Sequence, residues 1–215
     1  MEYLSFDAIE SVFQSLYPKP HARARVRVKK ELRSKLRSVL SSLSPEQIHE
    51  QSRRAASLLF AQPEYRQSQI MMIFLSLPQE PDTTPIVLQA WQDHKKVLAP
   101  QVIWDSRQMM PLEIRNLDED IGSNQFGIRE PIHGMPIPIE LIDLVIVPGL
   151  GFDPFGNRLG RGRGFYDRFL SKPEFRGVTC GLALESQVVE SIPAAHHDVK
   201  VRMLVTNETV RRFDP

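Results

Sequence analysis

Glycine and arginine alternate in one short stretch of this 215-residue chain. Six of the eleven glycines fall within residues 149–164, and Arg158, Arg161 and Arg163 stand among them. Backbone amides without bulky neighbouring side chains can approach an anion closely, and guanidinium groups match the geometry of phosphate oxygens. The stretch therefore indicates a phosphate-binding loop.

The same stretch departs from two common nucleotide-binding signatures. Gly156, Gly160 and Arg161 resemble a P-loop, but three residues instead of four separate the glycines, arginine stands where that loop needs lysine, and no serine or threonine follows. The pair Gly149-x-Gly151 is not completed to a dinucleotide fingerprint, because Pro154 occupies the place of the third glycine. The plain alternative is a surface loop with solvated arginines, and the interleaving of three arginines favours an anion site over it.

The loop follows a predicted strand, and the segments around it alternate between strand and helix. Nearly continuous apolar runs predict buried strands at residues 70–75, 96–99, 141–147, 178–184 and 203–206. Helical spacing predicts a long helix from Ala22, a second one after an N-cap at Ser44, and a third from Thr84. Prolines break residues 101–140, where we expect a β excursion and loops. This alternation predicts an α/β protein with a mainly parallel sheet, which binds ligands at the carboxyl ends of its strands.

The composition excludes several classes of protein. Lysine plus arginine is 27 and aspartate plus glutamate is 26, so the net charge of +1 opposes a nucleic-acid coat protein or an acidic tail. Cys180 is the single cysteine and cannot form an internal disulfide or a cysteine-based metal site. No apolar stretch approaches the ~18 residues of a membrane span, and Glu2, Asp7 and Glu10 oppose a signal peptide. We expect a cytoplasmic monomer that binds neither nucleic acid nor a membrane.

The first residues are predicted to form a separate element. Phe6, Ile9 and Phe13 have helical spacing, and a pair of prolines ends the pattern. We therefore divide the chain into an N-terminal extension with a short helix, residues 1–20, and a single α/β domain, residues 21–215.

The stretch from Arg158 to Tyr166 resembles the signature of the 5-formyltetrahydrofolate cyclo-ligases, also called 5,10-methenyltetrahydrofolate synthetases. Shorter pieces of the family pattern occur in the family's order on both sides, so the resemblance covers roughly residues 29–206. They are Lys-Lys-x-Leu-Arg at 29–33, Phe-Leu-Ser at 74–76, Phe-Gly-Ile-x-Glu-Pro at 126–131 and His-Asp-Val at 197–199. The resemblance implies a three-layer α/β/α fold with a mainly parallel central sheet, NagB/RpiA/CoA-transferase-like.

The family couples ATP hydrolysis to the cyclisation of 5-formyltetrahydrofolate to 5,10-methenyltetrahydrofolate, with release of ADP and phosphate. A formyl carbon on nitrogen is amide-like and a poor electrophile, and phosphorylation of its oxygen creates a leaving group. N10 of the same molecule then attacks the activated carbon, so that positioning supplies much of the rate. The resemblance implies ATP as co-substrate, Mg²⁺ as cofactor, and 5-formyltetrahydrofolate and ATP as the partners of the chain.

The functional residues of the family carry over position by position. We assign Arg161 and Tyr166 to catalysis and Asp167 and Asp198 to the metal. The ATP-binding positions are matched by Lys29, Arg33, Arg158, Leu159, Gly160, Arg161, Gly162, Arg163, Gly164, Phe165 and Tyr166. The folate-contacting positions are matched by Leu75, Glu80, Arg161, Gly162, Arg163, Gly164 and Phe165. Phe165 is a departure, since the family commonly has tyrosine there, and any hydrogen bond from that hydroxyl is lost.

Each carboxylate also has a plainer structural interpretation. Asp167 can be a carboxylate at a helix start that pairs with Arg163 or Arg168. Asp198 can be an ordinary turn residue, and Glu80 can be a loop side chain that faces water.

Two other functions remain open. A folate- or nucleotide-binding relative without catalysis would serve regulation, and Phe165 and the additional residues 1–28 leave room for it. A nucleic-acid-binding module would use the arginine loop and the eight basic side chains within residues 23–37. That run lacks aromatic residues and is typical of a solvated helix face, and the balanced total charge also opposes this function.

Overall fold

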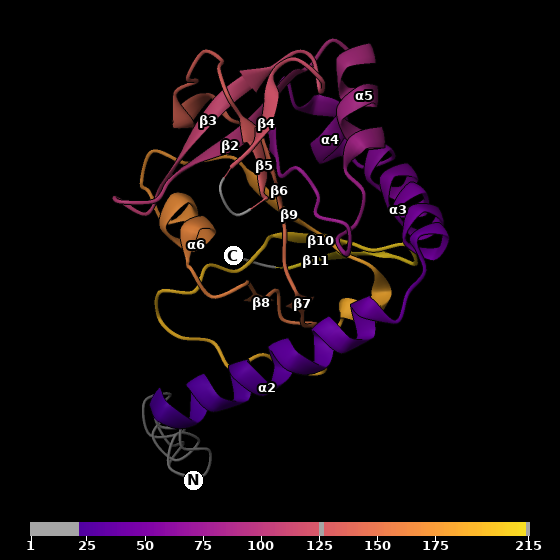
Figure 1. Cartoon of the computed structure of the whole chain (residues 1–215), viewed down its shortest axis with the longest axis vertical. Coiled ribbons are helices and arrows are strands. Elements are labelled where there is room, and N and C mark those ends of the chain that lie inside the picture. Colours follow the sequence, from indigo (N-terminus) through magenta and orange to yellow (C-terminus); the bar gives the residue numbers. More distant parts are fainter. Residues whose placement is uncertain (1–21, 125–126, 214–215) are drawn as a thin grey trace, which may run out of the picture.

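A seven-stranded sheet forms the centre of the protein (Figure 1). The computed structural model describes residues 22–124 and 127–213. In spatial order the strands are β11 (Val210–Arg212), β10 (Met203–Val205), β9 (Val178–Leu182), β6 (Leu144–Val147), β1 (Ile70–Ile73), β2 (Lys96–Ile103) and β3 (Gln108–Ile114). The inner strands run parallel, and the edge strands β3 and β11 run antiparallel to their neighbours. The predicted α/β class with a mainly parallel sheet is confirmed.

Side chains of the strands alternate between two cores, one on each face of the sheet. The helices are α2 (Ala22–Ser41), α3 (Pro45–Phe60), α4 (Pro63–Gln67), α5 (Thr84–Gln92) and α6 (Phe165–Leu170). In β1, Met71 and Ile73 pack against residues of α3, α4 and α5, whereas Met72 packs in the core that holds Phe152 and Phe169. The sheet therefore lies between a layer of three helices and a second layer made of α6 and the loops beside it (Figure 1).

The helix starts follow from the sequence. Ser44 caps α3 with a capping box, since its hydroxyl accepts a hydrogen bond from the Gln47 amide and the Gln47 side chain accepts one from the Ser44 amide. Proline occupies the first turn of both α3 and α5. The predicted helices from Ala22, after Ser44 and from Thr84 are confirmed. The short helix predicted within residues 1–20 lies outside the described residues.

Several predicted boundaries are wrong, and the edge strands β3 and β11 are not among the predicted strands. The strands predicted at 70–75, 178–184 and 203–206 end earlier, at Ile73, Leu182 and Val205, and the one predicted at 96–99 continues to Ile103. The strand predicted at 141–147 begins at Leu144, because a 3₁₀ turn, η1 (Ile139–Leu141), precedes it. The long strand β3 contains Pro111, which pairs with Pro100 of β2; β3 is the last strand of the sheet, and on its outer side only the isolated bridge between Leu112 and Pro136 continues the pairing. The short pair β4 (Ile121–Ser123) and β5 (Arg129–Pro131) is the β excursion expected in this region.

The order of the strands places a crevice at one end of the sheet. Strand β1 lies between β2 and β6. The chain first adds β2 and β3 on one side of β1 and later adds β6, β9 and β10 on the other side. At such a switch point the connections leave in opposite directions and open a site at the carboxyl ends of the strands. No helix within residues 22–124 and 127–213 is long and apolar enough to cross a membrane.

Candidate active site

A cavity of about 900 Å³ opens beyond the carboxyl ends of β1 and β6. Its wall includes every residue that the sequence analysis assigned to ATP, folate, metal or catalysis. They come from α2 (Lys29 and Arg33), the segment after β1 (Leu75 and Glu80), the loop and helix start at 158–167, and the loop that holds Asp198. The fold thus places around one cavity the residues that the sequence pattern identified at separate points along the chain.

The glycine-rich loop is fixed from both of its sides by arginines. The Arg33 Nε of α2 donates a hydrogen bond to the Gly160 carbonyl at 2.9 Å, and Arg168 Nη2 of α6 donates one to the Arg163 carbonyl at 2.7 Å. Gly162 has a φ of +104°, a conformation that residues with a side chain rarely adopt. The loop is therefore pre-formed, with glycines where the backbone turns beside the cavity.

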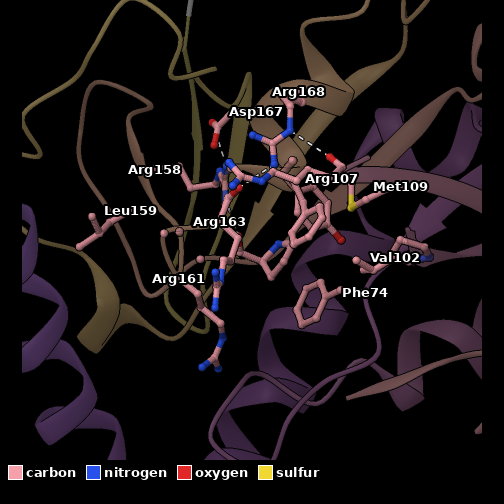
Figure 2. A pocket seen from close by; sticks show the side chains of 18 of the residues that line it. Phe74, Val102, Arg107, Met109, Arg158, Leu159, Arg161, Arg163, Asp167 and Arg168 are labelled. Carbon is pink, nitrogen blue, oxygen red and sulfur yellow. Dashed lines mark hydrogen bonds and ion pairs between the residues drawn. The ribbon is translucent and has the colours of Figure 1, made fainter. Parts of the chain in front are cut away.

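The three arginines of the loop have different surroundings (Figure 2). Arg158 is buried, and its guanidinium donates to Asp167 Oδ1 at 2.9 Å and to the Pro148 carbonyl at 3.2 Å. Arg161 and Arg163 are exposed at the cavity. Of the three guanidinium groups, those of Arg161 and Arg163 are thus the ones best placed to reach a ligand, whereas Arg158 mainly holds Asp167.

Leu159 takes part in the site through its backbone. The short strands β7 (Gly151–Phe152) and β8 (Arg158–Leu159) pair with each other and present the loop. The Leu159 side chain is buried with Leu36 of α2 and Ile192, and Figure 2 shows it directed away from the arginines. The leucine of the signature therefore attaches the loop to α2.

Glu80 and Arg161 form an ion pair across the cavity. Glu80 Oε1 accepts hydrogen bonds from Arg161 Nε at 3.0 Å and Nη2 at 2.7 Å, and Glu80 Oε2 accepts one from the Leu77 amide at 3.1 Å. Glu80 is buried, so the alternative of a loop glutamate facing water is wrong.

The two predicted metal carboxylates lie close to each other, and both are paired with cations. Asp167 Oδ1 accepts from Arg158 and also from the amide of Val199, the residue that follows Asp198. Asp198 Oδ2 accepts from Lys29 Nζ at 2.5 Å and from the Ala195 amide at 2.7 Å. Burial opposes ionisation of Asp198, but these hydrogen bonds outweigh it and hold its pKa below the ordinary value.

The alternative partners considered for Asp167 were Arg163 and Arg168, and its partner is Arg158 instead. Arg168 donates to the carbonyls of Arg107 and Arg163. Among the described residues, no group of three or more His, Cys, Asp or Glu side chains could hold a metal ion. Asp167 Oδ2 makes no hydrogen bond to the part of the chain that the structure describes, and one or two carboxylates with substrate oxygens and waters suffice for Mg²⁺.

The opposite wall of the cavity is apolar and aromatic. Phe74, Val102 and Met109 line it beside the arginines (Figure 2). The rings of Trp104 and Phe165 meet edge to face, with centroids 5.4 Å apart. This geometry offers aromatic surface to a flat heterocycle.

Tyr166 presents a buried polar atom in the same region. Its hydroxyl makes no hydrogen bond to a residue of 22–124 or 127–213, and burial raises the pKa of Tyr166. Its ring lies 5.7 Å from the Arg158 guanidinium carbon. The phenol is therefore a neutral group without a hydrogen-bond partner among these residues, and a bound ligand can supply that partner.

The cavity concentrates positive charge that the whole chain does not show. Nine lysine and arginine side chains and four carboxylates line it, although the net charge of the chain is +1. The sequence analysis assigned no ligand-binding role to Arg107, Arg129, Arg168 or Trp104. These residues lie on the β2–β3 hairpin, on β5 and on α6, and no sequence motif marks them.

Comparison with known proteins explains why these residues converge. A family model described as the 5-formyltetrahydrofolate cyclo-ligase family matches residues 25–207. The chain belongs to this family. Every residue assigned to the site lies within the matched range.

Curated relatives and solved structures agree with membership of the cyclo-ligase family. The chain is 30% identical over 172 residues to the 5-formyltetrahydrofolate cyclo-ligase of Escherichia coli K12, covering 79% of this chain and 94% of that protein. It is 32% identical over 170 residues to the Mus musculus enzyme of the same name, covering 74% and 84%.

The fold is shared with two solved structures. The NMR structure of Aquifex aeolicus 5,10-methenyltetrahydrofolate synthetase has a TM-score of 0.76 at 31% identity and covers 87% of this chain and 94% of that one. The 5,10-methenyltetrahydrofolate synthetase of Mycoplasma pneumoniae has a TM-score of 0.67 at 18% identity, covering 83% and 98%, and supports the fold. The cyclo-ligase fold predicted from the sequence is confirmed.

Proposed function

We propose that this chain catalyses the ATP-dependent cyclisation of 5-formyltetrahydrofolate to 5,10-methenyltetrahydrofolate, with release of ADP and phosphate. The observation that supports this most strongly is a single cavity whose wall combines a cationic glycine-rich loop with the aromatic pair Trp104 and Phe165. Family membership supplies the reaction, and the cavity supplies surfaces suited to both substrates. We propose further that the chain acts as a monomer in the cytoplasm.

The nucleotide belongs on the cationic side. Arg161 and Arg163 offer exposed guanidinium groups, Lys29 and Arg33 approach from α2, and the loop amides lie between them. Several donors that converge on one region suit a triphosphate, whose charge is spread over many oxygens. The low overall charge of the chain makes this a local property of the cavity rather than a general affinity for polyanions.

The pterin belongs on the aromatic side. Trp104 and Phe165 present ring surface, and the buried Glu80 carboxylate is an acceptor for the amino and ring N–H groups of a pterin. Phe165 provides ring surface but no hydroxyl, so the unpartnered Tyr166 hydroxyl next to it is the phenol that can bond to a ligand.

The chemistry needs orientation and charge more than a protein nucleophile. The formyl oxygen attacks the γ-phosphorus, the bond from that phosphorus to the β–γ bridging oxygen breaks, and ADP leaves. The N10 lone pair then forms a bond to the formyl carbon, N10 gives up its proton to the phosphate group, the carbon–oxygen bond to that group breaks, and phosphate departs. The cationic side chains Arg161 and Arg163 would stabilise the negative charge of the transferred group, and the cavity wall would hold N10 near the carbon.

The carboxylates fit a role in holding Mg²⁺ with the nucleotide. Asp167 and Asp198 would hold the ion together with phosphate oxygens, and the ion would supply charge neutralisation at the phosphates. The hydrogen bond from the Val199 amide to Asp167 keeps the two side chains on neighbouring backbone. Burial opposes ionisation of Asp198, but its hydrogen bonds from Lys29 and the Ala195 amide hold its pKa below the ordinary value and leave this carboxylate able to act as a ligand.

The direct test is an absorbance assay for methenyltetrahydrofolate with the purified chain. We expect product when 5-formyltetrahydrofolate, ATP and Mg²⁺ are all present, one ADP for each product formed, and none when ATP or the metal is omitted. Binding of both ligands without any product would support the alternative of a regulatory relative, and Phe165→Tyr would then show whether the missing hydroxyl is the cause.

A further inference from the structure

One ion pair joins the two halves of the cavity. The Lys29–Asp198 and Arg158–Asp167 pairs each lie within the part assigned to the nucleotide and its metal. Arg161 belongs to the glycine-rich loop, whereas Glu80 follows β1 on the side assigned to the pterin. The nucleotide would therefore contact one partner of this pair, and the pterin would contact the other.

The two partners differ in their freedom to move. The Arg161 side chain is 45% exposed, and that of Glu80 is 9% exposed. Glu80 is also fixed locally, since its Oε2 accepts from the Leu77 amide and its own amide donates to the Leu77 carbonyl at 2.9 Å. Arg161 can therefore turn toward a phosphate, while Glu80 has to stay where it is.

If Arg161 leaves, the Glu80 carboxylate stays buried without its counter-charge. A buried carboxylate that keeps only the Leu77 amide as a donor is unfavourable, so a nucleotide that attracts Arg161 binds less tightly than it would otherwise. The N–H groups of a pterin can take the place of the arginine donors. The second ligand thus removes the penalty that the first one creates.

We propose that the Arg161–Glu80 ion pair couples the two subsites, so that nucleotide and 5-formyltetrahydrofolate each raise the affinity of the chain for the other. This inference rests on the proposed function. The coupling is reciprocal by thermodynamic necessity, and the same factor applies to both ligands. Arg161 and Glu80 thereby link the occupancy of the two subsites before chemistry.

Calorimetric binding of each ligand to the full chain, alone and with the other ligand saturating, measures the coupling. The non-hydrolysable β,γ-imido analogue of ATP with Mg²⁺ serves as the nucleotide, so that no turnover occurs. We expect each ligand to bind at least about fivefold more tightly when the other is present. Equal affinities with and without the other ligand would overturn the inference.

Glu80→Gln separates coupling from simple pterin contact. Because the neutral amide holds Arg161 less strongly and needs no counter-charge, the variant should bind the nucleotide analogue alone about three- to tenfold more tightly than the wild type. A residue that only contacts pterin would leave nucleotide affinity in the absence of folate unchanged, and that result would contradict the proposal. Glu185→Gln is the matched control, since Glu185 pairs with Arg211 away from the cavity, and it should preserve both affinities and the coupling.

Arg161→Gln tests the other partner at an exposed position, in case Glu80→Gln fails to fold. It should bind 5-formyltetrahydrofolate with the same affinity whether or not the nucleotide analogue is present, and persistent coupling would overturn the inference. Wild-type chain that binds both ligands independently and still turns over would refute the coupling alone. Wild-type chain that binds neither ligand would refute the proposed function and the coupling together.

Discussion

Asp167 has two roles that can be separated at the level of single residues. It neutralises Arg158, whose side chain is 5% exposed, and it presents a second carboxylate oxygen in the cavity. The first role concerns stability, because a buried guanidinium without its counter-charge is unfavourable. The second concerns catalysis through the nucleotide and its metal.

Asp167→Asn should therefore lower both kcat and the free energy of unfolding, but to different extents. We expect kcat to fall by about 100-fold or more, since a carboxylate ligand of the proposed Mg²⁺ is removed, and the free energy of unfolding to fall by about 1–2 kcal/mol. Steady-state kinetics and urea unfolding measure the two effects. Glu64→Gln breaks a comparable pair with Arg212 outside the cavity and should reduce stability only slightly while kcat stays unchanged.

Trp104 tests the assignment of the aromatic wall. Trp104→Leu removes the edge contact with Phe165 and should raise KM for 5-formyltetrahydrofolate about tenfold, with little change in KM for ATP. Trp91→Phe is the matched control, because the Trp91 indole packs in the core on the other face and donates to the Ile114 carbonyl. It should change stability and neither KM. A similar rise in both KM values for Trp104→Leu would place this ring outside the pterin subsite.

Helix α2 contributes to the site as a whole element. The face of α2 that is turned toward the protein packs Leu36 against Leu159, and from the same face Lys29 bonds to Asp198 and Arg33 bonds to the Gly160 carbonyl. The helix therefore clamps the glycine-rich loop and the Asp198 loop together. Lys29 and Arg33 are one turn apart, so both belong to the same face.

Lys29→Met should loosen this clamp and raise KM for ATP about tenfold, because both a phosphate-facing cation and the partner of Asp198 are lost. Arg27→Met lies on the same helix, but the Arg27 side chain is 80% exposed and, among the described residues, its ion pair is with Glu31, so KM should not change. Initial rates at varied ATP decide the matter. Equal effects of the two substitutions would show that α2 contributes general charge rather than a specific contact.

The Lys29–Asp198 pair also predicts a pH dependence. The pKa of Asp198 is lower in the folded chain than its ordinary value of about 4, so the pair stabilises the fold above that pH. The contribution is lost as the pH falls through the lower folded-state pKa. Urea unfolding from pH 6 to about 3 should show a smaller loss of stability for Asp198→Asn than for the wild type; parallel losses would contradict this.

The elements were largely predictable because local signals agree with the tertiary structure. Ser44 and Pro45 mark a helix start through hydrogen bonds within one turn, and the β1 residues form a short apolar run that two cores cover. The β2–β3 hairpin was not predictable in the same way. Its prolines oppose regular structure, and they are accommodated because β3 is an edge strand and β2 pairs with β1 only up to Leu98.

The site was predictable in composition but not in connectivity. The signature around Arg161 indicated its ligands, yet its partner Glu80 lies 81 residues away, and no local pattern encodes such a contact. The same holds for Arg158, which forms the pair with Asp167 in place of Arg163 or Arg168. Resemblance to a family supplied the residues, and the order of the strands decides which of them meet.

At the scale of the whole molecule, charge is distributed unevenly. The chain is almost neutral, but the cavity has an excess of cations over carboxylates. Both proposed substrates are anions, so the field at the cavity should accelerate their encounter with the enzyme.

This distribution predicts a salt dependence of kcat/KM. Raising the ionic strength from about 20 to about 200 mM should lower kcat/KM for both substrates several-fold, because screening shortens the reach of the field. Arg107→Gln at the exposed edge of the cavity should flatten the dependence, whereas Arg115→Gln, 81% exposed and outside it, should not. A dependence that Arg115→Gln flattens as much as Arg107→Gln would assign the effect to net charge.

The central claim is that this cavity activates the formyl group by phosphorylation of its oxygen. The most direct measurement uses 5-formyltetrahydrofolate labelled with ¹⁸O in the formyl group, incubated with the chain, ATP and Mg²⁺, followed by mass analysis of the released phosphate. The account predicts that each methenyltetrahydrofolate formed is matched by one phosphate that carries the label. Unlabelled phosphate alongside product, or product without ATP, would contradict it.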